Sequence, residues 1–556
     1  MNTALLFALA HSRAVLPFAV LAVTGVVAII MRLWLPSAKQ AVLGRVGSKK
    51  VWVPLCLVFL VSYLLIVFCN VAYPGYLEHV EPSIASVSYI VLRGAPLYHG
   101  MDSAQRYAFP YGPMGFLPYS LALRFLGAQI LSLKLVVLLA NVLLLGLLWK
   151  SYRRLLDPSL ALLVSVGVIA YCLMSGNYVL QVRGDILILL SVALGLFAAL
   201  SNSSLLSVLL YSVACATAFD IKITGFLYLF PLFILFLRRH SWRLAVLSAA
   251  GSAGLALAPF LSARISLAGY LEWLKLLSHE PLSRIEALRE LPVLFLMCVP
   301  VGLLFWELAL RSRGAATAYL KANRVFMLAL GLCVAMVAVS STKIGSGPHH
   351  FVPFYPILGY VCADIYSHLQ AQPVAEQDSA GWDWVPIVWS WLAIVVTLNA
   401  GIAIGPTAWI LFTGRSVAAS VTADLEMVMR DHPNKTIEMG YGGWNSKYKL
   451  TYYRPLLVFA GNPLTLDAMA LGDMQLVGIA IPPGTLEYLQ ECKTQIWLIP
   501  KGDRPFEMIN VYSLMDRRLF PERMVFSDEF RQIFAERYRK QPASKYFDIW
   551  ECGTQS

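Results

Sequence analysis

Residues 51–100 read VWVPLCLVFLVSYLLIVFCNVAYPGYLEHVEPSIASVSYIVLRGAPLYHG, an apolar run followed at once by two acids. The run 51–73 exceeds the roughly 20 residues that a helix needs to cross a bilayer. A charged side chain costs about 2.5–3.5 kcal/mol at the centre of a membrane helix. Glu78 and Glu81 avoid that cost because they lie just beyond the run. We therefore expect a membrane helix that ends with an acidic pair at the interface.

Apolar runs of this kind recur along most of the chain. Of its 556 residues, 58% are hydrophobic and 14% are charged, whereas soluble domains carry about 25% charged residues. This composition predicts a polytopic α-helical membrane protein with about 12 transmembrane helices. The expected spans lie near 14–35, 51–73, 130–149, 159–175, 186–201, 204–220, 223–238, 244–261, 291–310, 325–342, 351–368 and 385–411. The shorter run 113–126 favours a re-entrant or interfacial segment.

The net charge of +12 needs no nucleic-acid partner, because Lys and Arg gather in short loops between spans, as the positive-inside rule expects. These basic loops are 37–50, 150–157, 238–243 and 311–324. They all fall on the cytoplasmic side, so the first outer loop, 74–129, falls on the opposite face. The resulting regions are 1–50, with an extra N-terminal helix and a basic loop; 51–411, the transmembrane region; and 412–556.

Beyond residue 411 the long apolar runs stop, and charges, Gly and Pro become frequent. The remaining chain is long enough for one compact domain. Its pattern predicts helices at 421–433 and 485–492 that alternate with short strands at 436–442, 476–481 and 495–500. We therefore expect a small extracytoplasmic α/β domain at the C-terminal end.

Cys492 and Cys552 are the cysteines of this domain, and the other seven of the nine lie in or beside apolar spans. Outside the cytoplasm the pair is expected to form a disulfide, with two free, buried thiols as the alternative. The domain also holds two aromatic stretches, GYGGWNSKY (440–448) and TYYRPL (451–456). Their rings suit either sugar stacking or the domain core, and we favour the core.

A short helix is expected directly after the acidic pair. Pro82 suits the first helical position, and Gly94 suits the position just past the end. The stretch PSIASVSYIVLR (82–93) would then make about three turns. Its apolar stripe favours a helix that lies flat on the membrane surface. Alternatively, Glu81 is only a helix N-terminal acid, which contributes some tenths of a kcal/mol.

Further polar residues collect at the outer ends of other spans. They are Arg183 and Asp185 in one turn, Asp220 and Lys222 in a second, and Lys343, His349 and His350 in a third. The first outer loop adds Arg93, Tyr98, His99, Arg106, Tyr107 and Tyr111. The first turn suits a structural ion pair as well as a site. The second suits a snorkelling pair, and the adjacent histidines of the third are expected to point apart.

Together these features resemble the GT-C glycosyltransferases, polytopic enzymes that use lipid-phosphate sugars. The resemblance is carried by EHVE (78–81), GAPLYHG…YAFPYGP (94–113) with its preceding helix, the Arg-x-Asp turn (183–185) and KIGSGPHHFVPF (343–354). It covers roughly residues 51–368 and is nearest to the bacterial branch of lipopolysaccharide-core sugar transferases and mannosyltransferase-like proteins. The family's first-loop acid is usually aspartate, whereas both acids here are glutamates, and this chain has an extra span before the family's first.

The resemblance implies a polyprenyl-phosphate monosaccharide as donor, a glycan, lipid or protein hydroxyl as acceptor, and a single displacement with inversion. Glu78 is the candidate base and Glu81 the second candidate, and such a base contributes about 10²–10⁴-fold. The leaving phosphate must be neutralised, and the candidates for this are Lys343 first, then Arg183, His349 and Lys222. Candidate substrate-binding residues are His79, Arg93, Tyr98, Arg106, Tyr111, Asp185 and His350.

A divalent metal is an open question at this stage. Glu81 and Asp185 offer oxygen ligands, which would suit Mg²⁺ or Mn²⁺, but their spacing does not require a metal. The resemblance also implies a location in the bacterial inner membrane, surrounded by lipids, with the C-terminal domain in the periplasm.

Three other classes of protein stay open. A transporter or flippase for lipid-linked glycans places ionisable residues at the membrane midplane and often shows inverted repeats, whereas most charges here lie at span ends. An O-antigen ligase or polymerase also needs outer-face cations but needs no early acid pair. A non-enzymatic assembly protein leaves the acids unexplained. The sequence shows no GxGxxG or Walker loop for a soluble nucleotide sugar.

Overall fold

A helix forms at each predicted span between residues 51 and 371. The computed structural model describes residues 49–107, 111–371, 407–515 and 521–553. The long helices are α3 (Lys49–Ala72), α6 (Ile130–Tyr152), α7 (Pro158–Met174), α8 (Gly184–Leu200), α9 (Ser204–Ile221), α10 (Gly225–Arg239), α11 (Trp242–Leu257), α13 (Arg284–Arg311), α14 (Arg313–Ser341) and α15 (Tyr355–Ala371). Within the described part, 6 helices are long and apolar enough to cross a membrane. The predicted spans near 14–35 and 385–411 fall largely outside the described residues.

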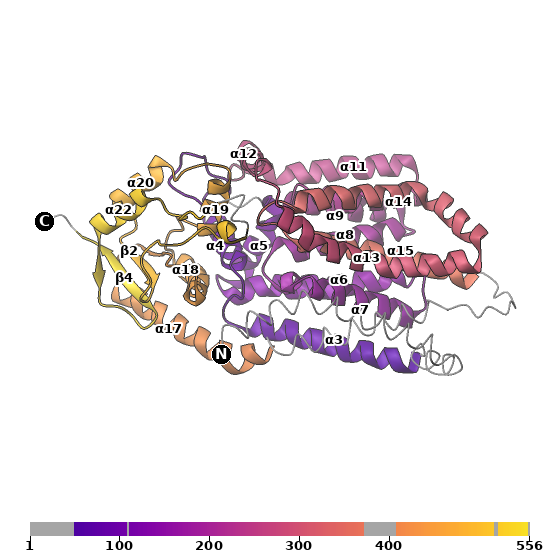
Figure 1. Cartoon of the computed structure of the whole chain (residues 1–556), viewed down its shortest axis with the longest axis horizontal. Coiled ribbons are helices and arrows are strands. Elements are labelled where there is room, and N and C mark those ends of the chain that lie inside the picture. Colours follow the sequence, from indigo (N-terminus) through magenta and orange to yellow (C-terminus); the bar gives the residue numbers. More distant parts are fainter. Residues whose placement is uncertain (1–48, 108–110, 372–406, 516–520, 554–556) are drawn as a thin grey trace.

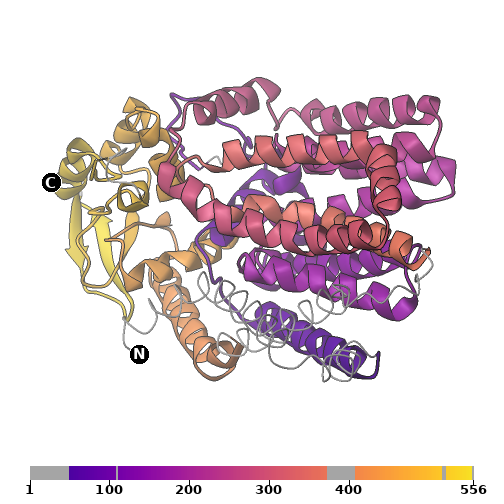
Figure 2. The same cartoon turned by 45° about the vertical axis from the view of Figure 1, so that its right-hand side comes forward.

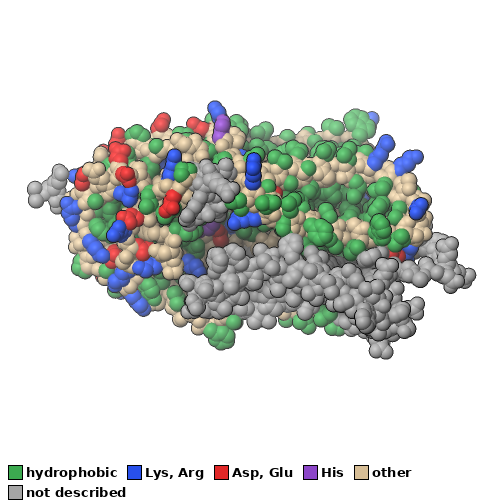
Figure 3. Space-filling view, in the orientation of Figure 1, with side chains coloured by type: hydrophobic (Ala, Val, Ile, Leu, Met, Phe, Trp, Pro, Cys, Tyr) green, Lys and Arg blue, Asp and Glu red, His purple; other side chains and the backbone are tan. Residues whose placement is uncertain are grey.

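The helices lie side by side along the long axis of the molecule, and the C-terminal domain lies at one end of this bundle (Figure 1). The turned view shows the same arrangement (Figure 2). The flank of the bundle exposes many large apolar side chains, such as Leu139, Leu328 and Leu332. Figure 3 shows this apolar flank, with Lys and Arg at the end far from the C-terminal domain and mixed charges on that domain. A lipid-facing belt with polar ends explains this distribution.

The helix after the acidic pair is α4 (Val80–Leu92). It begins two residues earlier than expected, with His79 at the N-cap, so Pro82 lies inside the first turn and not at its first position. Arg93 is the C-cap. Gly94 follows with a φ of +109°, a conformation that favours glycine and ends the helix as predicted.

The prediction that this helix lies flat on the membrane is wrong, because protein buries its apolar stripe. Ile84 and Val87 are both fully buried. On one side α4 packs against α5 (Leu117–Leu126), and on the other against α18 (Arg454–Phe459) of the C-terminal domain. One buried apolar cluster therefore continues from the bundle through α4 into the C-terminal domain.

Shorter elements complete the outer end of the bundle and the turns beside it. They are η1 (Pro113–Gly115), η2 (Asn177–Leu180), η3 (Ala258–Leu261), α12 (Leu267–Ser278), η4 (Pro348–Phe354) and η5 (Ile410–Gly414). The run 113–126 forms η1 and then the short helix α5, on which Leu121 and Phe125 are exposed. At 10 residues α5 is shorter than a membrane crossing requires.

The C-terminal domain combines helices with a four-stranded sheet of order β1-β2-β4-β3. Its elements are α17 (Arg415–Asp431), β1 (Ile437–Met439), η6 (Ser446–Tyr453), α18, α19 (Ala468–Leu476), α20 (Pro483–Gln490), β2 (Ile496–Pro500), α21 (Val511–Met515), α22 (Asp528–Arg537), β3 (Tyr538–Gln541) and β4 (Phe547–Cys552). The β1–β2 pair is parallel and the other two pairs are antiparallel. The sheet confirms two of the predicted strands, and α20 lies at the helix predicted between them.

The predicted strand at 476–481 does not form. Gly478 adopts a φ of +81°, and the Ile479 N–H donates to the Met474 carbonyl at 3.0 Å. These apolar residues therefore cap the end of α19. The central strand β2 is paired on both edges by β1 and β4. The expected disulfide between Cys492 and Cys552 is present and ties the end of β4 to the turn after α20.

A buried ion pair holds the C-terminal domain on α4. Arg454 Nη2 lies 2.5 Å from Asp467 Oδ2, and the Ser83 hydroxyl of α4 donates to the same oxygen at 2.6 Å. The first outer loop is attached by its backbone as well. The Arg106 N–H donates to Thr465 O at 2.7 Å, and the Asp467 N–H donates to Arg106 O at 2.8 Å.

Replacing Arg454 with Met should lower the stability of the protein by about 3–5 kcal/mol, because Asp467 is then left as an unpaired buried charge. The double variant Arg454→Met/Asp467→Asn should recover most of this loss, since no buried charge remains unpaired. Thermal unfolding in lipid nanodiscs measures both effects. A single variant as stable as the parent would show that the pair does not hold the domain.

Candidate active site

Charged side chains from three segments form one row of ion pairs at the end of the bundle that adjoins the C-terminal domain. Arg183, the N-cap of α8, lies between two acids. Its Nη1 is 3.2 Å from Glu78 Oε2, and its Nε donates to Asp185 Oδ2 at 2.8 Å. Lys222 extends the row, with its Nζ 2.8 Å from Asp185 Oδ1. The cations and carboxylates of this row balance each other in charge.

The expected pairing of Asp220 with Lys222 is wrong. Lys222 is the C-cap of α9 and has an extended backbone, which sends its side chain to Asp185. Asp220 still belongs to α9 and is 1% exposed. Within the described residues neither of its carboxylate oxygens has a hydrogen-bond partner. The ion pair of Arg183 with Asp185, by contrast, is present.

The two first-loop acids have different surroundings. Glu81 is 1% exposed, and its carboxylate accepts the N–H groups of Leu77 at 2.8 Å, Glu78 at 3.2 Å and Val182 at 2.9 Å. Burial raises the pKa of Glu81, and the nearby charge of Lys134 opposes this. Because its oxygens are already engaged by backbone groups, Glu81 fixes the turn and is poorly placed to take a substrate proton.

Glu78 is the more accessible acid, with a side chain 20% exposed. One of its carboxylate oxygens faces Arg183 and the other faces the His79 imidazole. Burial alone would raise the pKa of Glu78, but His79 and Arg183 outweigh it and lower the pKa to about 2. Glu78 is therefore ionised at neutral pH and able to accept a proton.

A buried lysine that the sequence analysis missed supports this turn. Lys134 of α6 donates to the carbonyl oxygens of Asn70 at 2.8 Å, Tyr73 at 2.8 Å and Gly75 at 2.6 Å. It thereby satisfies the C-terminal end of α3 and directs the chain toward Glu78. A lone lysine inside an apolar span was the available signal, because such residues are rarely placed there without a partner.

The two histidines of η4 adjoin the ion-pair row. Contrary to expectation their rings lie together, with centroids 4.5 Å apart, and His349 lies 4.7 Å from Tyr178. Burial lowers the pKa of His350 to about 3, with Lys222 acting in the same direction. Burial likewise lowers the pKa of His349. Both imidazoles are therefore neutral at pH 7.

Lys343 points to a neighbouring part of the outer face. Its Nζ donates to the Leu277 carbonyl at 2.6 Å, and its charge acts on Glu280. The structure thus brings Arg183 and Lys222 together at Glu78 and Asp185, but not Lys343.

The remaining first-loop candidates divide into site and scaffold. Tyr111 lies in the site, with Lys222 Nζ 5.6 Å from its ring centroid. Tyr98 is buried, and its hydroxyl donates to the Tyr111 carbonyl at 2.8 Å. Arg106 is fully buried and donates to loop carbonyls, including Gln105 O at 2.6 Å, so it orders the loop. Arg93 is exposed at the end of α4.

The oxygens of Glu81 and Asp185, the two candidate metal ligands, are engaged by other groups in this arrangement. Glu81 accepts backbone N–H groups with both oxygens, and Asp185 is paired with Arg183 and Lys222. In the described part of the chain, no group of three or more His, Cys, Asp and Glu residues could hold a metal ion.

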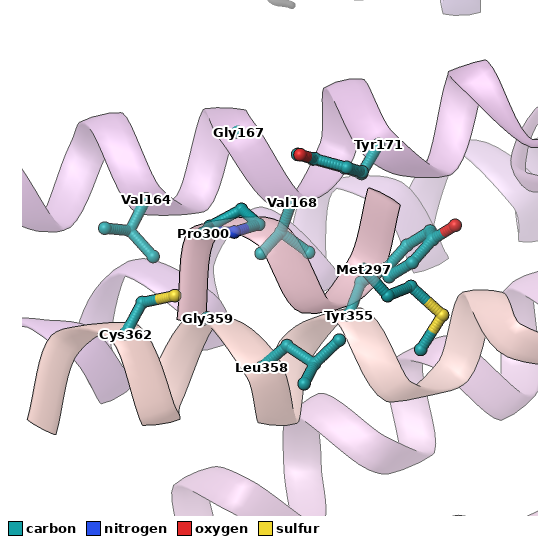
Figure 4. A pocket seen from close by; sticks show the side chains of 10 residues that line it. All are labelled: Val164, Gly167, Val168, Tyr171, Met297, Pro300, Tyr355, Leu358, Gly359 and Cys362. Carbon is teal, nitrogen blue, oxygen red and sulfur yellow. The ribbon is translucent and has the colours of Figure 1, made fainter. Parts of the chain in front are cut away.

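An apolar groove lies between α7, α13 and α15 (Figure 4). Its lining side chains are Val164, Val168, Tyr171, Met297, Pro300, Tyr355, Leu358 and Cys362, with Gly167 and Gly359 between them. At its outer end the hydroxyls of Tyr355 and Ser175 are 2.7 Å apart. Tyr355 directly follows η4, which carries His349, so this short helix connects the groove lining to the charged cluster along the chain.

A second group of acids, also missed from the sequence, lies between the domain and the bundle. Asp473 of α19 is buried and accepts a hydrogen bond from the Tyr512 hydroxyl. Burial raises the pKa of Asp473. Burial also raises the pKa of Glu280, and the charge of Asp473 raises it further, whereas Lys343 lowers it. At neutral pH this pair therefore retains protons that ordinary carboxyl groups would release.

The aromatic stretches of the C-terminal domain are core, as favoured, with one exception. Tyr441, Tyr448, Tyr452 and Tyr453 are all buried. Trp444, from the same stretch as Tyr441, is 36% exposed.

No protein-family model and no curated protein matches the chain. Among solved structures it is similar to two crystal structures of ArnT from Cupriavidus metallidurans, one bound to undecaprenyl phosphate and one in the apo state. The alignments cover 90% of this chain and 99% of that chain, with a TM-score of 0.52 and sequence identities of 12% and 13%. At this identity the similarity shows a shared fold with ArnT, and the 6 apolar helices of the described part agree with a multi-pass membrane protein.

The acid pair of Glu280 and Asp473 should make stability fall as pH rises. In the unfolded chain these groups titrate near their ordinary values of 4.5 and 3.8, but in the native state both values are raised. At pH values between the ordinary and the raised pKa of these groups, the native protein binds more protons than the unfolded chain. The unfolding free energy therefore declines with rising pH. The double variant Glu280→Gln/Asp473→Asn should therefore lose less Tm than the parent from about pH 5 to about pH 8. Parallel Tm profiles of the two proteins would contradict this.

Proposed function

We propose that this protein is a membrane glycosyltransferase that moves a monosaccharide from a polyprenyl-phosphate donor to an acceptor hydroxyl at the outer face. The observation that carries the proposal is the gathering of Arg183 and Lys222 in one charged row, together with an apolar groove whose lining residue Tyr355 directly follows η4. A lipid phosphate has these two parts, a long apolar tail and an anionic head. The similarity in fold to ArnT, one structure of which is bound to undecaprenyl phosphate, supports the same class of donor.

The donor tail would lie along α7 and α15, where the groove lining is almost wholly apolar. The phosphate would lie at Arg183 and Lys222, with the neutral His349 as a hydrogen-bonding neighbour. Arg183 can contact two phosphate oxygens at once, whereas Lys222 acts as a point charge. Lys343 is the alternate cation on the neighbouring turn.

The reaction would be a single displacement with inversion. The acceptor oxygen attacks the anomeric carbon and forms the new glycosidic bond. The bond between that carbon and the phosphate oxygen breaks, and its electron pair leaves with polyprenyl phosphate. Glu78 takes the proton of the acceptor hydroxyl, while Arg183 and Lys222 stabilise the charge on the leaving group. Glu81 acts indirectly, because its carboxylate holds the turn that carries Glu78.

The proposed location is the bacterial inner membrane, with the C-terminal domain in the periplasm. The disulfide between Cys492 and Cys552 supports this side of the membrane, since such bonds persist in oxidising compartments. On the same grounds the acceptor is a hydroxyl of a glycan, lipid or protein that is present outside the cytoplasm. The nearest branch remains that of the lipopolysaccharide-core sugar transferases.

Replacing Glu78 with Gln should reduce donor turnover by about 10²–10⁴-fold, the usual contribution of a general base. The variant should still bind donor, because Arg183 and the groove remain. Purified protein in nanodiscs is given a panel of radiolabelled polyprenyl-phosphate sugars, and release of polyprenyl phosphate is measured. Glu426→Gln, on an exposed part of α17, is the control and should match the parent. Full activity of Glu78→Gln would remove Glu78 from the mechanism.

Filling the groove should change donor binding and not the rate of turnover, the reverse of the effect expected for Glu78→Gln. Leu358→Trp places a larger ring in the lining and should weaken donor binding by about tenfold or more, with little change in the rate of the bound complex. Leu332→Trp, on the exposed flank of α14, adds the same ring outside the groove as control. If no donor of the panel binds to the parent, the transferase proposal fails, and lipid flipping becomes the activity to measure.

A further inference from the structure

The loop 440–445, GYGGWN, is built to hold one tryptophan in a fixed place. A side chain at Gly440 would clash with Ile499, and one at Gly442 would clash with Asp503. The Asp503 carboxylate then accepts the Gly443 N–H at 3.3 Å and the Asn445 side-chain amide at 3.1 Å. These contacts tie both neighbours of Trp444 to one carboxylate, so the loop is pre-organised.

The Trp444 ring lies on a buried base and reaches toward the candidate active site. Its centroid is 4.3 Å from the ring of Tyr448, which is 5% exposed. On the bundle side the ring meets His79 in a T-shaped contact, with centroids 6.4 Å apart. Trp444 itself remains 36% exposed. A rigid, supported and partly open aromatic ring is therefore presented one side chain away from Glu78.

The two carboxylate oxygens of Glu78 face opposite sides of the site. One oxygen faces Arg183, where the proposed donor phosphate lies, and the other faces His79. Trp444 lies beyond His79, so it stands on the side away from the leaving group. An inverting displacement brings the acceptor in from that side, opposite the bond that breaks. The position of Trp444 thus suits the acceptor and not the donor.

We propose that Trp444 is the stacking platform for a sugar ring of the acceptor, and that the acceptor is therefore a glycan. This inference rests on the proposed function and names its acceptor class. A pyranose presents a face of C–H groups that packs on an aromatic ring, while its hydroxyls remain free for polar neighbours. His79 supplies such a neighbour beside the ring, with 28% of its side chain exposed. The stacked sugar would offer one hydroxyl to Glu78.

The test is binding of the intact protein to a printed array of bacterial surface oligosaccharides that also carries lipid headgroups and acidic and basic peptides. The parent should bind oligosaccharide spots, and Trp444→Ala should bind them about tenfold more weakly, as is common when a central tryptophan is truncated. Trp444→Phe keeps an aromatic face and should retain most of the binding. Trp242→Ala removes a tryptophan that is 65% exposed at the start of α11 and should match the parent.

The inference is overturned if Trp444→Ala binds the oligosaccharides like the parent. It is also overturned if the parent binds only lipid headgroups or peptides, or no spot at all. Oligosaccharide binding that depends on Trp444, together with absence of donor turnover, would sink the proposed transferase but leave the sugar platform standing. Donor turnover with unaltered binding by Trp444→Ala would remove the platform alone.

Discussion

The buried carboxylate of Glu81 is the contact on which the rest of the site depends. It accepts N–H groups from its own turn, at Leu77 and Glu78, and from Val182, more than a hundred residues away. Val182 precedes Arg183, so one carboxylate fixes Glu78 and Arg183 relative to each other. An ionised group pays a large desolvation cost in such a position unless it is paired and hydrogen-bonded. The charge of Lys134 and the backbone N–H groups offset part of that cost.

The α4 helix carries this geometry to the C-terminal domain. Its first turn holds Glu81 on the bundle side, and Ser83, two residues on, contacts Asp467 on the domain side. The domain is thus positioned by the same helical turn that positions Glu78. Trp444 and His79 meet across this junction. A domain docked elsewhere would leave the outer side of Glu78 open to water, so the domain shapes the site as much as the bundle does.

Local signals in the sequence predicted much of this structure, whereas contacts between distant segments were not predicted. Span length, the Gly94 end of α4 and the cysteine pair are each decided within a short stretch or by compartment. The pairing of Lys222 with Asp185 joins separate helix ends, and a snorkelling pair with Asp220 satisfied the same local pattern. The prediction of a strand at 476–481 was wrong because an apolar run with one glycine fits both a strand and a helix cap. The choice depends on tertiary structure, because β1 and β4 already pair with both edges of β2.

The balance of charge in the row also bears on how a base so acidic would act. Arg183 and His79 hold the pKa of Glu78 near 2, and a carboxylate of that acidity is a weak base. A donor phosphate bound at Arg183 would compete with Glu78 for the same guanidinium. Loss of that partner would remove one of the influences that lower the pKa of Glu78, whereas burial, which raises it, would remain. Under the proposed function, Glu78 therefore becomes a stronger base when the donor is in place, and the acceptor is activated only when there is a sugar to receive.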